Sequence, residues 1–365
     1  MKFKSEKEKL LRALAVAQKA TGNAGTLPVL ENVFLSAEGQ SVEVSATNLE
    51  MAITTSFEAK IQNEGKITVP AKTLLSWISL ADGDEIAVEK TDGESLFLKT
   101  KSAKTKIKGL SADEFPALPM VEKQNAFQIS QKDFKKAISK VIFAAAVSGT
   151  RPVLSGIFLW SDAENLYFVG TDSYRLSEKK VALAAPPTEK ISCIVPAKTL
   201  NELERLLSDD GEMEIIFSKN QILFLFDGIR LVSRLIDGQF PNYQQILPKS
   251  FKNEIAVDRR AFIQTVKRVG IFARENNNNL KIHFSEKTAT ITTDATEIGS
   301  EESTLEIQNS NGENEIALNA QFLLDALLVI SGEKVVFKLG ESLAPVLLST
   351  PDDPDFRHLI MPLKN

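Results

Sequence analysis

The sequence predicts an α+β protein made of three tandem copies of one unit, each with two helices packed on antiparallel sheet. Three observations support this prediction: a hexapeptide that recurs unchanged, segments that alternate apolar and polar residues around short turns, and a basic amphipathic helix near the start of each copy. A chain of 365 residues, 43% hydrophobic and 25% charged, has room for two or three globular domains. The expected domains are residues 1–122, 123–248 and 249–365.

The repeat is clearest in the hexapeptide Val-Pro-Ala-Lys-Thr-Leu, which occupies Val69–Leu74 and again Val195–Leu200. A fainter third copy has Leu318–Leu323 in its place, and Thr293-Asp294 in the place of Thr171-Asp172. Copies of about 120 residues are too long for solenoid repeats of roughly 20–50 residues, so they are interpreted as domains. Similar domains joined tail to head are expected to curve, and a dimer would close the curve into a ring.

Each copy is expected to open with a helix, continue with strands, form a second helix after the Pro-Ala-Lys element and end in further strands. Ser41–Ser45 alternates with period two, which is typical of a half-buried strand. Asp92-Gly93 predicts a hairpin turn between Glu85–Lys90 and Ser95–Lys99. A meander with Asp227-Gly228 at its second turn is predicted over Met213–Phe217, Ile222–Phe226 and Ile229–Leu235.

The first helix of each copy carries a basic stripe, although the chain has a net charge of −5. Lys132, Lys136 and Lys140 recur every four residues, which places them on one helix face. A single charged face is usually only the solvated side of a helix. Three equivalent positive helices in an acidic chain instead favour contact with a polyanion. No base-reading pattern accompanies them, so such contacts would be to phosphates.

The inventory of catalytic groups is poor. His283 and His358 have no metal-ligand or triad neighbour by spacing, and the chain lacks a Walker A loop, G-x-S-x-G and G-x-G-x-x-G. The single cysteine, Cys193, cannot form an internal disulfide and is expected to be buried in a strand. Nothing in this inventory favours an enzyme, although missing short motifs do not exclude one, and no metal or cofactor is expected.

The N-terminal segment does not fit a signal peptide, because Arg12 interrupts its apolar run and Glu6 and Glu8 lie where basic residues belong. No apolar stretch is long enough to span a bilayer. A cytoplasmic location without membrane partners is expected.

Four segments together resemble the β subunit family of bacterial DNA polymerase III, the sliding clamps. They are Thr150–Gly156, Gly170–Ser177, Leu235–Tyr243 and the tail Met361-Pro362-Leu363. The resemblance covers the whole chain. It implies a head-to-tail homodimer, in which each chain is half of a six-domain ring that encircles duplex DNA. It also implies a clamp loader that opens the ring, tethering of the polymerase III α subunit and of other polymerases or repair proteins, and work at the nucleoid during replication.

The resemblance implies three sets of site residues. A pocket for short peptide motifs would use Leu154, Thr171, Ser173, Tyr174, Arg175, Leu176, Pro241, Ile246, Asn319, Phe322, Leu343, Leu359, Met361, Pro362 and Leu363. The residues facing DNA would be Arg12, Lys19, Lys72, Lys132, Lys136, Lys140, Arg151, Lys198, Arg205, Arg260 and Lys267. The dimer interface would use Lys99, Lys101, Lys104, Lys106, Ile107, Ile271, Phe272, Glu297, Glu301 and Glu302.

Within these sets, Arg175 and Asn319 are expected to bind polar groups of the peptide, and Ile271 and Phe272 to form an apolar plug. Ser173-Tyr174 departs from the Gly-His that many family members have, and the loop Gly22–Gly25 lacks an arginine that some members place near DNA. Two alternatives stay open: a repeat-domain scaffold that never encircles DNA, and a hydrolase that uses Asp172 and Arg175.

Overall fold

The computed structural model of the chain describes residues 1–22, 25, 27–91, 93–119, 121, 125–147, 151–185, 187, 189–307, 312–341 and 343–363. These residues form six α-helices and four antiparallel sheets, which confirms the predicted α+β class. Among the described helices, none has the length and apolar character that crossing a membrane requires.

Each repeat contributes two helices, and a strand precedes the first of them. The helices are α1 (Lys7–Ala17), α2 (Ala71–Leu80), α3 (Gln131–Val141), α4 (Ala197–Leu206), α5 (Arg259–Ala273) and α6 (Ala320–Val329). The expectation that each copy opens with a helix is therefore wrong. Lys2–Glu6 buries every second residue and pairs with neighbouring strands, a short pattern hidden beside the longer helix signal.

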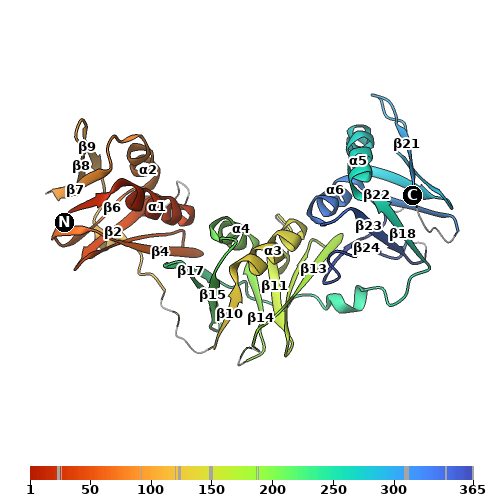
Figure 1. Ribbon diagram of the computed structural model, residues 1–365, viewed down its shortest axis with the longest axis horizontal. Helices are drawn as coiled ribbons and strands as arrows, with labels where there is room; N and C mark the ends of the chain where they lie inside the picture. Colours follow the sequence, from red (N-terminus) through yellow and green to blue (C-terminus); the bar gives the residue numbers. More distant parts are fainter. Residues whose placement is uncertain are drawn as a thin grey trace. The chain divides into compact units, whose positions relative to one another are not determined.

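One compact unit comprises residues 1–132, 187–189 and 202–235. Its five-stranded sheet has the order β5 (Lys60–Asn63), β1 (Lys2–Glu6), β7 (Glu85–Thr91), β8 (Ser95–Lys99) and β9 (Lys104–Lys108). Its eight-stranded sheet has the order β10 (Asn125–Ser130), β15 (Glu212–Phe217), β16 (Gln221–Phe226), β17 (Ile229–Arg234), β4 (Met51–Glu58), β3 (Ser41–Thr47), β2 (Asn32–Glu38) and β6 (Gly65–Pro70). Helix α1 lies beside α2 and packs on β3 and β4 (Figure 1).

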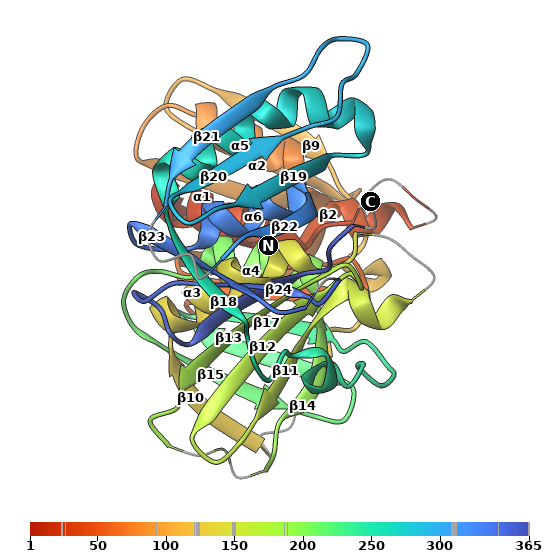
Figure 2. The same ribbon diagram turned by 90° about the vertical axis from the view of Figure 1, so that its right-hand side faces the viewer.

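The other compact unit comprises residues 133–186, 190–201 and 236–365. Its eight-stranded sheet has the order β14 (Ser192–Pro196), β11 (Gly156–Ser161), β12 (Asn165–Thr171), β13 (Arg175–Ala182), β25 (Phe356–Ile360), β24 (Val346–Ser349), β23 (Lys334–Leu339) and β18 (Asn253–Asp258). Its four-stranded sheet has the order β21 (Glu302–Glu306), β20 (Thr288–Thr292), β19 (Asn279–Phe284) and β22 (Asn314–Asn319). Strands β11, β12 and β13 run side by side (Figure 2).

Each eight-stranded sheet is shared between neighbouring repeats. Strand β17 of the second repeat pairs with β4 of the first, and β25 of the third repeat pairs with β13 of the second. Backbone hydrogen bonds and apolar packing therefore join the repeats directly.

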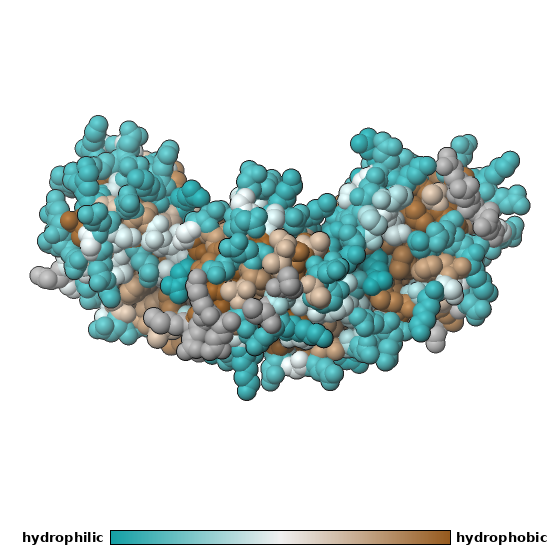
Figure 3. All heavy atoms as spheres, turned by 60° about the horizontal axis from the view of Figure 1, so that its bottom comes forward, coloured by the Kyte–Doolittle hydropathy of each residue, from teal (hydrophilic) through white to brown (hydrophobic). Residues whose placement is uncertain are grey.

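The apolar faces of the helices form the core with the inner faces of the sheets. In the second repeat Phe134 of α3 meets Phe168 edge to face, with ring centroids 5.0 Å apart. In the third repeat Phe262 of α5 meets Phe337 in the same way at 5.2 Å. Burying such side chains contributes about 1.5–3 kcal/mol each. Figure 3 shows mostly hydrophilic residues on the face it draws, with apolar residues in patches between them.

The predicted meander is confirmed as β15, β16 and β17. Asp227 and Gly228 both have positive φ, 47° and 74°, as a two-residue turn that matches strand twist requires. The predicted pairing of β7 with β8 is also confirmed. Asp92 of that hairpin lies outside the described residues, while Gly93 has a φ of 82°.

In every repeat the first residue of the first helix forms hydrogen bonds with the end of the second helix or with the segment that follows it. Lys7 donates to the carbonyls of Ser79 and Ala81. Gln131 accepts from the backbone amide of Ser208. In the third repeat the Arg259 guanidinium donates to the carbonyls of Leu327 and Gly332. Part of the basic stripe on α5 is thus used to satisfy helix-end carbonyls.

Candidate functional site

A pocket with a cavity volume of about 140 Å³ lies beside the joint between β13 and β25. Its lining is mostly apolar and comprises Arg151, Leu154, Thr171, Ser173, Arg175, Leu176, Pro241, Asn242, Tyr243, Ile246, Leu359 and Met361. The structure therefore brings together residues from both repeats that were proposed for the pocket. Sequence reasoning missed Asn242 and Tyr243, although both belong to the quoted segment Leu235–Tyr243.

Several residues proposed for the pocket lie outside this cavity. Leu343, Pro362 and Leu363 line a second hollow of about 670 Å³ whose wall includes Glu313, Glu315 and Glu341. The tail separates the two hollows, because the Met361 amide donates to the Tyr174 carbonyl and the Leu363 amide to the Ala317 carbonyl, both at 2.8 Å. Tyr174 itself is 65% exposed at the rim.

Asn319 and Phe322 lie at the start of α6 and are not among the residues that line the pocket. The Asn319 side chain is the N-cap of α6 and accepts from the amides of Gln321 and Phe322 at 2.9 and 3.1 Å. The expectation that Asn319 binds the peptide is at odds with this, since its carbonyl oxygen already holds the helix start.

A side-chain turn shapes the pocket rim between β12 and β13. The Asp172 carboxylate accepts from the amides of Tyr174 and Arg175 at 2.9 and 3.0 Å, and the Thr171 hydroxyl donates to the Arg175 carbonyl at 2.6 Å. Ser173 has a φ of 82°, a left-handed conformation that Gly or Asn adopts more easily. A glycine at this position would relieve this strain.

The first repeat contains the same turn at Thr47–Met51, with Leu49 at a φ of 73°. The third repeat does not. Ladder pairs counted from the second helix of each repeat put Asp294, and not Thr293, at the position of Thr171. The sequence alignment of the faint third copy was therefore wrong by one residue, and no Thr-Asx turn forms there.

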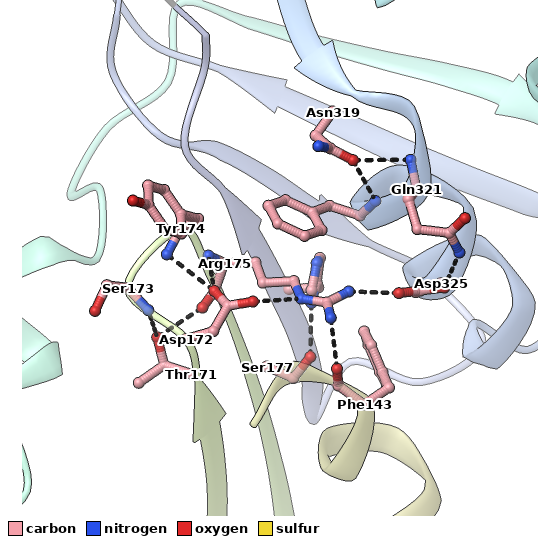
Figure 4. A network of polar contacts seen from close by, with 12 residues as sticks. Phe143, Thr171, Asp172, Ser173, Tyr174, Arg175, Ser177, Asn319, Gln321 and Asp325 are labelled. Carbon is pink, nitrogen blue, oxygen red and sulfur yellow. Dashed lines mark hydrogen bonds and ion pairs between the residues drawn. The ribbon is translucent and has the colours of Figure 1, made fainter. Parts of the chain in front are cut away.

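The Arg175 guanidinium forms hydrogen bonds with three partners within the chain (Figure 4). Its guanidinium donates to the carboxylate of Asp172 at 3.0 Å, to that of Asp325 on α6 at 2.6 Å and to the Phe143 carbonyl at 2.7 Å. The Phe322 ring lies over it, with the guanidinium carbon 4.5 Å from the ring centre. Arg175 also lines the pocket, and its predicted role in binding peptide polar groups stays a prediction, because these three hydrogen bonds use only part of its guanidinium. The Asp172 and Arg175 pair of the hydrolase alternative is occupied in the same way.

His358 is a core histidine, as its isolation in the sequence suggests. It is fully buried on β25, and its Nδ1 lies 2.6 Å from the Ser177 hydroxyl. Burial lowers the pKa of His358 to about 3, with a further contribution from the charge of Arg175. The ring is therefore neutral at physiological pH.

Lys140 was predicted to face DNA, and this prediction is wrong. The residue is 4% exposed. Its ammonium donates to the Val329 carbonyl at the end of α6 and to the Ser331 hydroxyl, and lies 3.8 Å from the Asp353 carboxylate. Lys179 pairs with the same carboxylate. One carboxylate thus serves two buried ammonium groups where the second and third repeats meet.

The environment of Lys140 changes its titration. Burial lowers its pKa to about 8, although Asp353 opposes the shift. The nearby cations Lys136, Lys179 and Arg259 lower it further. Between pH 8 and the ordinary value of 10.5 the native side chain is neutral while the unfolded one keeps its proton. The free energy of unfolding should therefore rise with pH in this window.

We expect this rise to disappear in the variant Lys140→Met. The free energy of unfolding of the native chain minus that of the variant should grow by about 1–3 kcal/mol from about pH 7 to about pH 10. Urea unfolding of both chains at the two pH values measures it. Lys132→Met, at an exposed position on α3 about two turns earlier, is the control and should show no such growth. If the difference in unfolding free energy between the native chain and Lys140→Met does not change with pH, the pKa of Lys140 is not lowered in the folded chain.

The other basic residues differ in their availability. Lys19 and Arg205 share the Glu202 carboxylate at 3.7 and 2.8 Å. Arg151 lines the pocket and lies outside the α-helices, and its assignment to DNA stays a prediction. Exposed side chains without an ion pair to another described residue are Arg12, Lys72, Lys132, Lys136, Lys198, Arg260 and Lys267.

The residues assigned to a dimer interface lie on or near two edge strands and on α5. Strand β9, with Lys104 and Lys106, is an edge of the five-stranded sheet, and β21 is an edge of the four-stranded sheet. Ile107 points into the core and is 7% exposed, so it cannot reach a partner. Glu301 already pairs with Arg268 at 2.8 Å, which lowers the pKa of that carboxyl.

Two further expectations concern exposure. Ile271 is 54% exposed, as an apolar plug requires. Cys193 is half-buried on β14, and burial raises the pKa of its thiol to about 12. The cysteine therefore stays protonated and unreactive at neutral pH.

Comparison with known proteins gives matches along nearly the whole chain. Models of the DNA polymerase III beta subunit match residues 1–119 (N-terminal domain), 128–242 (central domain) and 244–364 (C-terminal domain). The beta sliding clamp of Synechococcus elongatus is 30% identical, over 100% of this chain and 99% of that protein. Crystal structures of the Bacillus subtilis sliding clamp and the Pseudomonas aeruginosa DNA polymerase III subunit beta match with a TM-score of 0.96 each. They are 27% and 28% identical and cover 100% of this chain, and 99% and 100% of those chains.

Proposed function

Because the chain belongs to the DNA polymerase III beta subunit family, we propose that it is a processivity factor that closes into a ring around duplex DNA and tethers the polymerase there. Its relatives are named sliding clamps, and the chain is accordingly an accessory subunit and not an enzyme. The observation that carries the proposal is a pair of edge strands, β9 and β21. They occupy the same places in their repeats as the strands that join the repeats internally.

The two internal joints have the same construction. Each pairs the last strand of the first sheet of one repeat with the third strand of the second sheet of the preceding repeat: β17 with β4, and β25 with β13. Strand β9 is the equivalent of β17 and β25, and β21 is the equivalent of β4 and β13. A second chain that brings its β21 to β9 would complete a sheet like the other two. Doing so at both ends closes two chains into a ring of six domains.

The register of this third joint follows from the other two. Ladder pairs counted from the helix starts put three basic residues at one equivalent position, namely Arg230, Arg357 and Lys104. They put three residues at the position that faces it, namely Thr54, Glu178 and Glu302. Arg357 and Glu178 are ladder partners and form an ion pair, with Nε 2.6 Å from Oε1. Lys104 of one chain should therefore face Glu302 of the other.

The charges of the two edges support this joint. Strand β9 carries Lys104, Lys106 and Lys108, while β21 carries Glu302 and Glu306. Opposite charges on facing strands stabilise the pair, and the excess of one sign on each edge discourages like edges from pairing. The exposed Ile271 and the half-buried Phe272 on α5 supply apolar contact beside the strands.

A disulfide tests the joint and its register. We expect the double variant Lys104→Cys with Glu302→Cys to form a covalent dimer under mild oxidation, because facing residues have Cα atoms about 4.5–5.5 Å apart. Non-reducing electrophoresis measures the dimer band.

The control places the second cysteine elsewhere on the same strand. Lys104→Cys with Glu306→Cys moves it four residues away, about 13 Å, and should not cross-link. Each single variant checks that Cys193 takes no part. Equal cross-linking by both cysteine pairs, or no cross-linking by either, would contradict the proposed joint.

The exposed basic residues of the helices are proposed to contact DNA. Arg12, Lys132, Lys136, Arg260 and Lys267 lie on the first helices of the three repeats. Loose contacts of such side chains with phosphates are independent of sequence, so every position on the duplex has a similar energy. A ring held by topology can then slide. A clamp loader is proposed as the partner that opens it.

The apolar pocket is proposed to receive short peptide motifs of the polymerase III α subunit and of other polymerases or repair proteins. A cavity lined by Leu154, Leu176, Leu359 and Ile246 suits leucine and phenylalanine anchors. The guanidinium of Arg175 is partly engaged within the chain, and Arg151 is a further cation at the pocket that can meet an acidic group of the peptide. Work at the nucleoid in the cytoplasm follows from this role.

A further inference from the structure

A buried carboxylate connects the pocket wall to the strand joint beneath it. Glu178 on β13 is 3% exposed, and its Oε1 accepts from Nε of Arg357 on β25 at 2.6 Å. Its other oxygen, Oε2, accepts from the hydroxyl of Tyr243. That hydroxyl in turn accepts from the Trp160 indole at 2.9 Å. Tyr243 also lines the pocket, so one side chain belongs to both the pocket and the network.

The alternation of the two strands explains this arrangement. Leu176 and Leu359 are ladder partners and both line the pocket. Two residues further along each strand, Glu178 and Arg357 are ladder partners on the same face of the sheet. An apolar row that forms the pocket is thus followed by a charged row, and Tyr243 contributes to both.

Each member of the network depends on the others. A buried carboxylate without partners is costly, so Glu178 requires both Arg357 and the Tyr243 hydroxyl. Burial, and then the charge of Glu178, raise the pKa of Tyr243, which keeps its hydroxyl protonated and able to donate. The Tyr243 ring is fixed at its far end by hydrogen bonds, whereas the neighbouring wall residues Leu154 and Ile246 are held by packing alone.

We propose that Glu178 and Arg357 are positioning residues for the peptide pocket, which hold the Tyr243 ring as its wall and so couple peptide affinity to the joint between the second and third repeats. The inference rests on the proposed peptide-binding function. By reciprocity, a bound peptide stabilises this joint as much as the joint favours the peptide.

A double-mutant cycle on the full chain tests this coupling. The variants are Tyr243→Phe, which keeps the ring and removes the hydroxyl, Arg357→Met, and their combination. The probe is a fluorescent peptide with leucine and phenylalanine anchors, and its Kd is measured by anisotropy. We expect each single change to weaken binding about three- to tenfold, and the double change to weaken it no more than the larger single effect. If Arg357→Met does not fold, Glu178→Gln takes its place, because the amide keeps an acceptor for Tyr243 and removes the charge that Arg357 needs.

The matched control is Lys180→Met. Lys180 also joins β13 to the third repeat, through an ion pair with Asp355 at 2.7 Å, but it is more exposed and does not line the pocket. Its replacement should leave the peptide Kd unchanged. Multiplicative losses in the cycle, or an equal loss in Lys180→Met, would overturn the coupling while leaving the pocket in place. A native chain that binds no such peptide would overturn both the coupling and the proposed peptide site.

Discussion

A chain carrying Glu297→Lys, Glu301→Lys and Glu302→Lys should sediment as a monomer of 40.2 kDa, whereas we expect the native chain to sediment as a dimer. The three changes put positive charge next to and opposite the lysines of β9. Like charges at an interface cost several kcal/mol, and a ring contains the joint twice. We expect the dimer dissociation constant to rise at least about a hundredfold. Sedimentation velocity over a dilution series measures it.

Two further variants distinguish charge repulsion at the joint from a general loss of folding. Adding Lys104→Glu and Lys106→Glu to the triple variant restores opposite signs across the joint and should restore the dimer. Glu313→Lys with Glu315→Lys adds positive charge beside and on β22, at the other edge of the same sheet, and should leave the dimer intact. A triple variant that stays dimeric at all dilutions would remove β21 from the interface.

Replacing Arg175 by methionine should lower the free energy of unfolding by about 3–5 kcal/mol. The change removes the guanidinium that pairs with the carboxylates of Asp172 and Asp325 and donates to the carbonyl of Phe143. The arginine side chain is only 10% exposed, so water cannot fully replace it. Urea unfolding measures the loss. Arg175→Lys should rescue little, because one ammonium cannot reproduce the planar fork that reaches three acceptors.

The control for this experiment is again Lys180→Met, which removes a more exposed ion pair and should cost less than about 1 kcal/mol. The result also distinguishes two roles of Arg175. If Arg175→Met keeps native stability and loses only peptide affinity, the guanidinium binds the peptide and the bracing role is wrong. A large loss of stability agrees with the contacts to α6 and to the end of α3.

Local sequence patterns were sufficient for much of the fold. The repeated hexapeptide places α2 and α4, and Asp227-Gly228 places a turn whose two positive φ angles few other residues accept. The same holds for the Thr171–Arg175 turn, whose side-chain hydrogen bonds all fall within five residues. Such features depend on neighbours in the chain, and the sequence therefore contains them.

The misjudged or missed site residues depend on contacts between distant residues. Lys140 continues the stripe of Lys132 and Lys136, and only the arrival of α6 and Asp353, about 190 to 210 residues later, buries it. The hydrogen bonds of Arg175 to Asp325 and Phe143 likewise join residues that are far apart in the sequence. Tyr243 lay inside a recognised segment, but its link to Glu178 depends on the pairing of β13 with β25.

The shared sheets explain why Lys140, which was wrongly placed, and Tyr243, which was missed, both lie where two repeats meet. Residues at a joint meet partners from another repeat, which no pattern within one repeat encodes. The same joints, compared with one another, then predict the register of the proposed joint between two chains. Internal repetition thus replaces the second chain as a source of information about the interface between chains.

The most direct test of the proposed ring is its dependence on DNA ends. The chain is loaded by a clamp loader on nicked circular DNA, and protein retained on the DNA is measured by gel filtration before and after a single cut. A ring should stay on the circle and leave once the DNA is linear, and a bound protein block at both ends should keep it in place. Retention on unblocked linear DNA would contradict encirclement and would favour an ordinary DNA-binding scaffold.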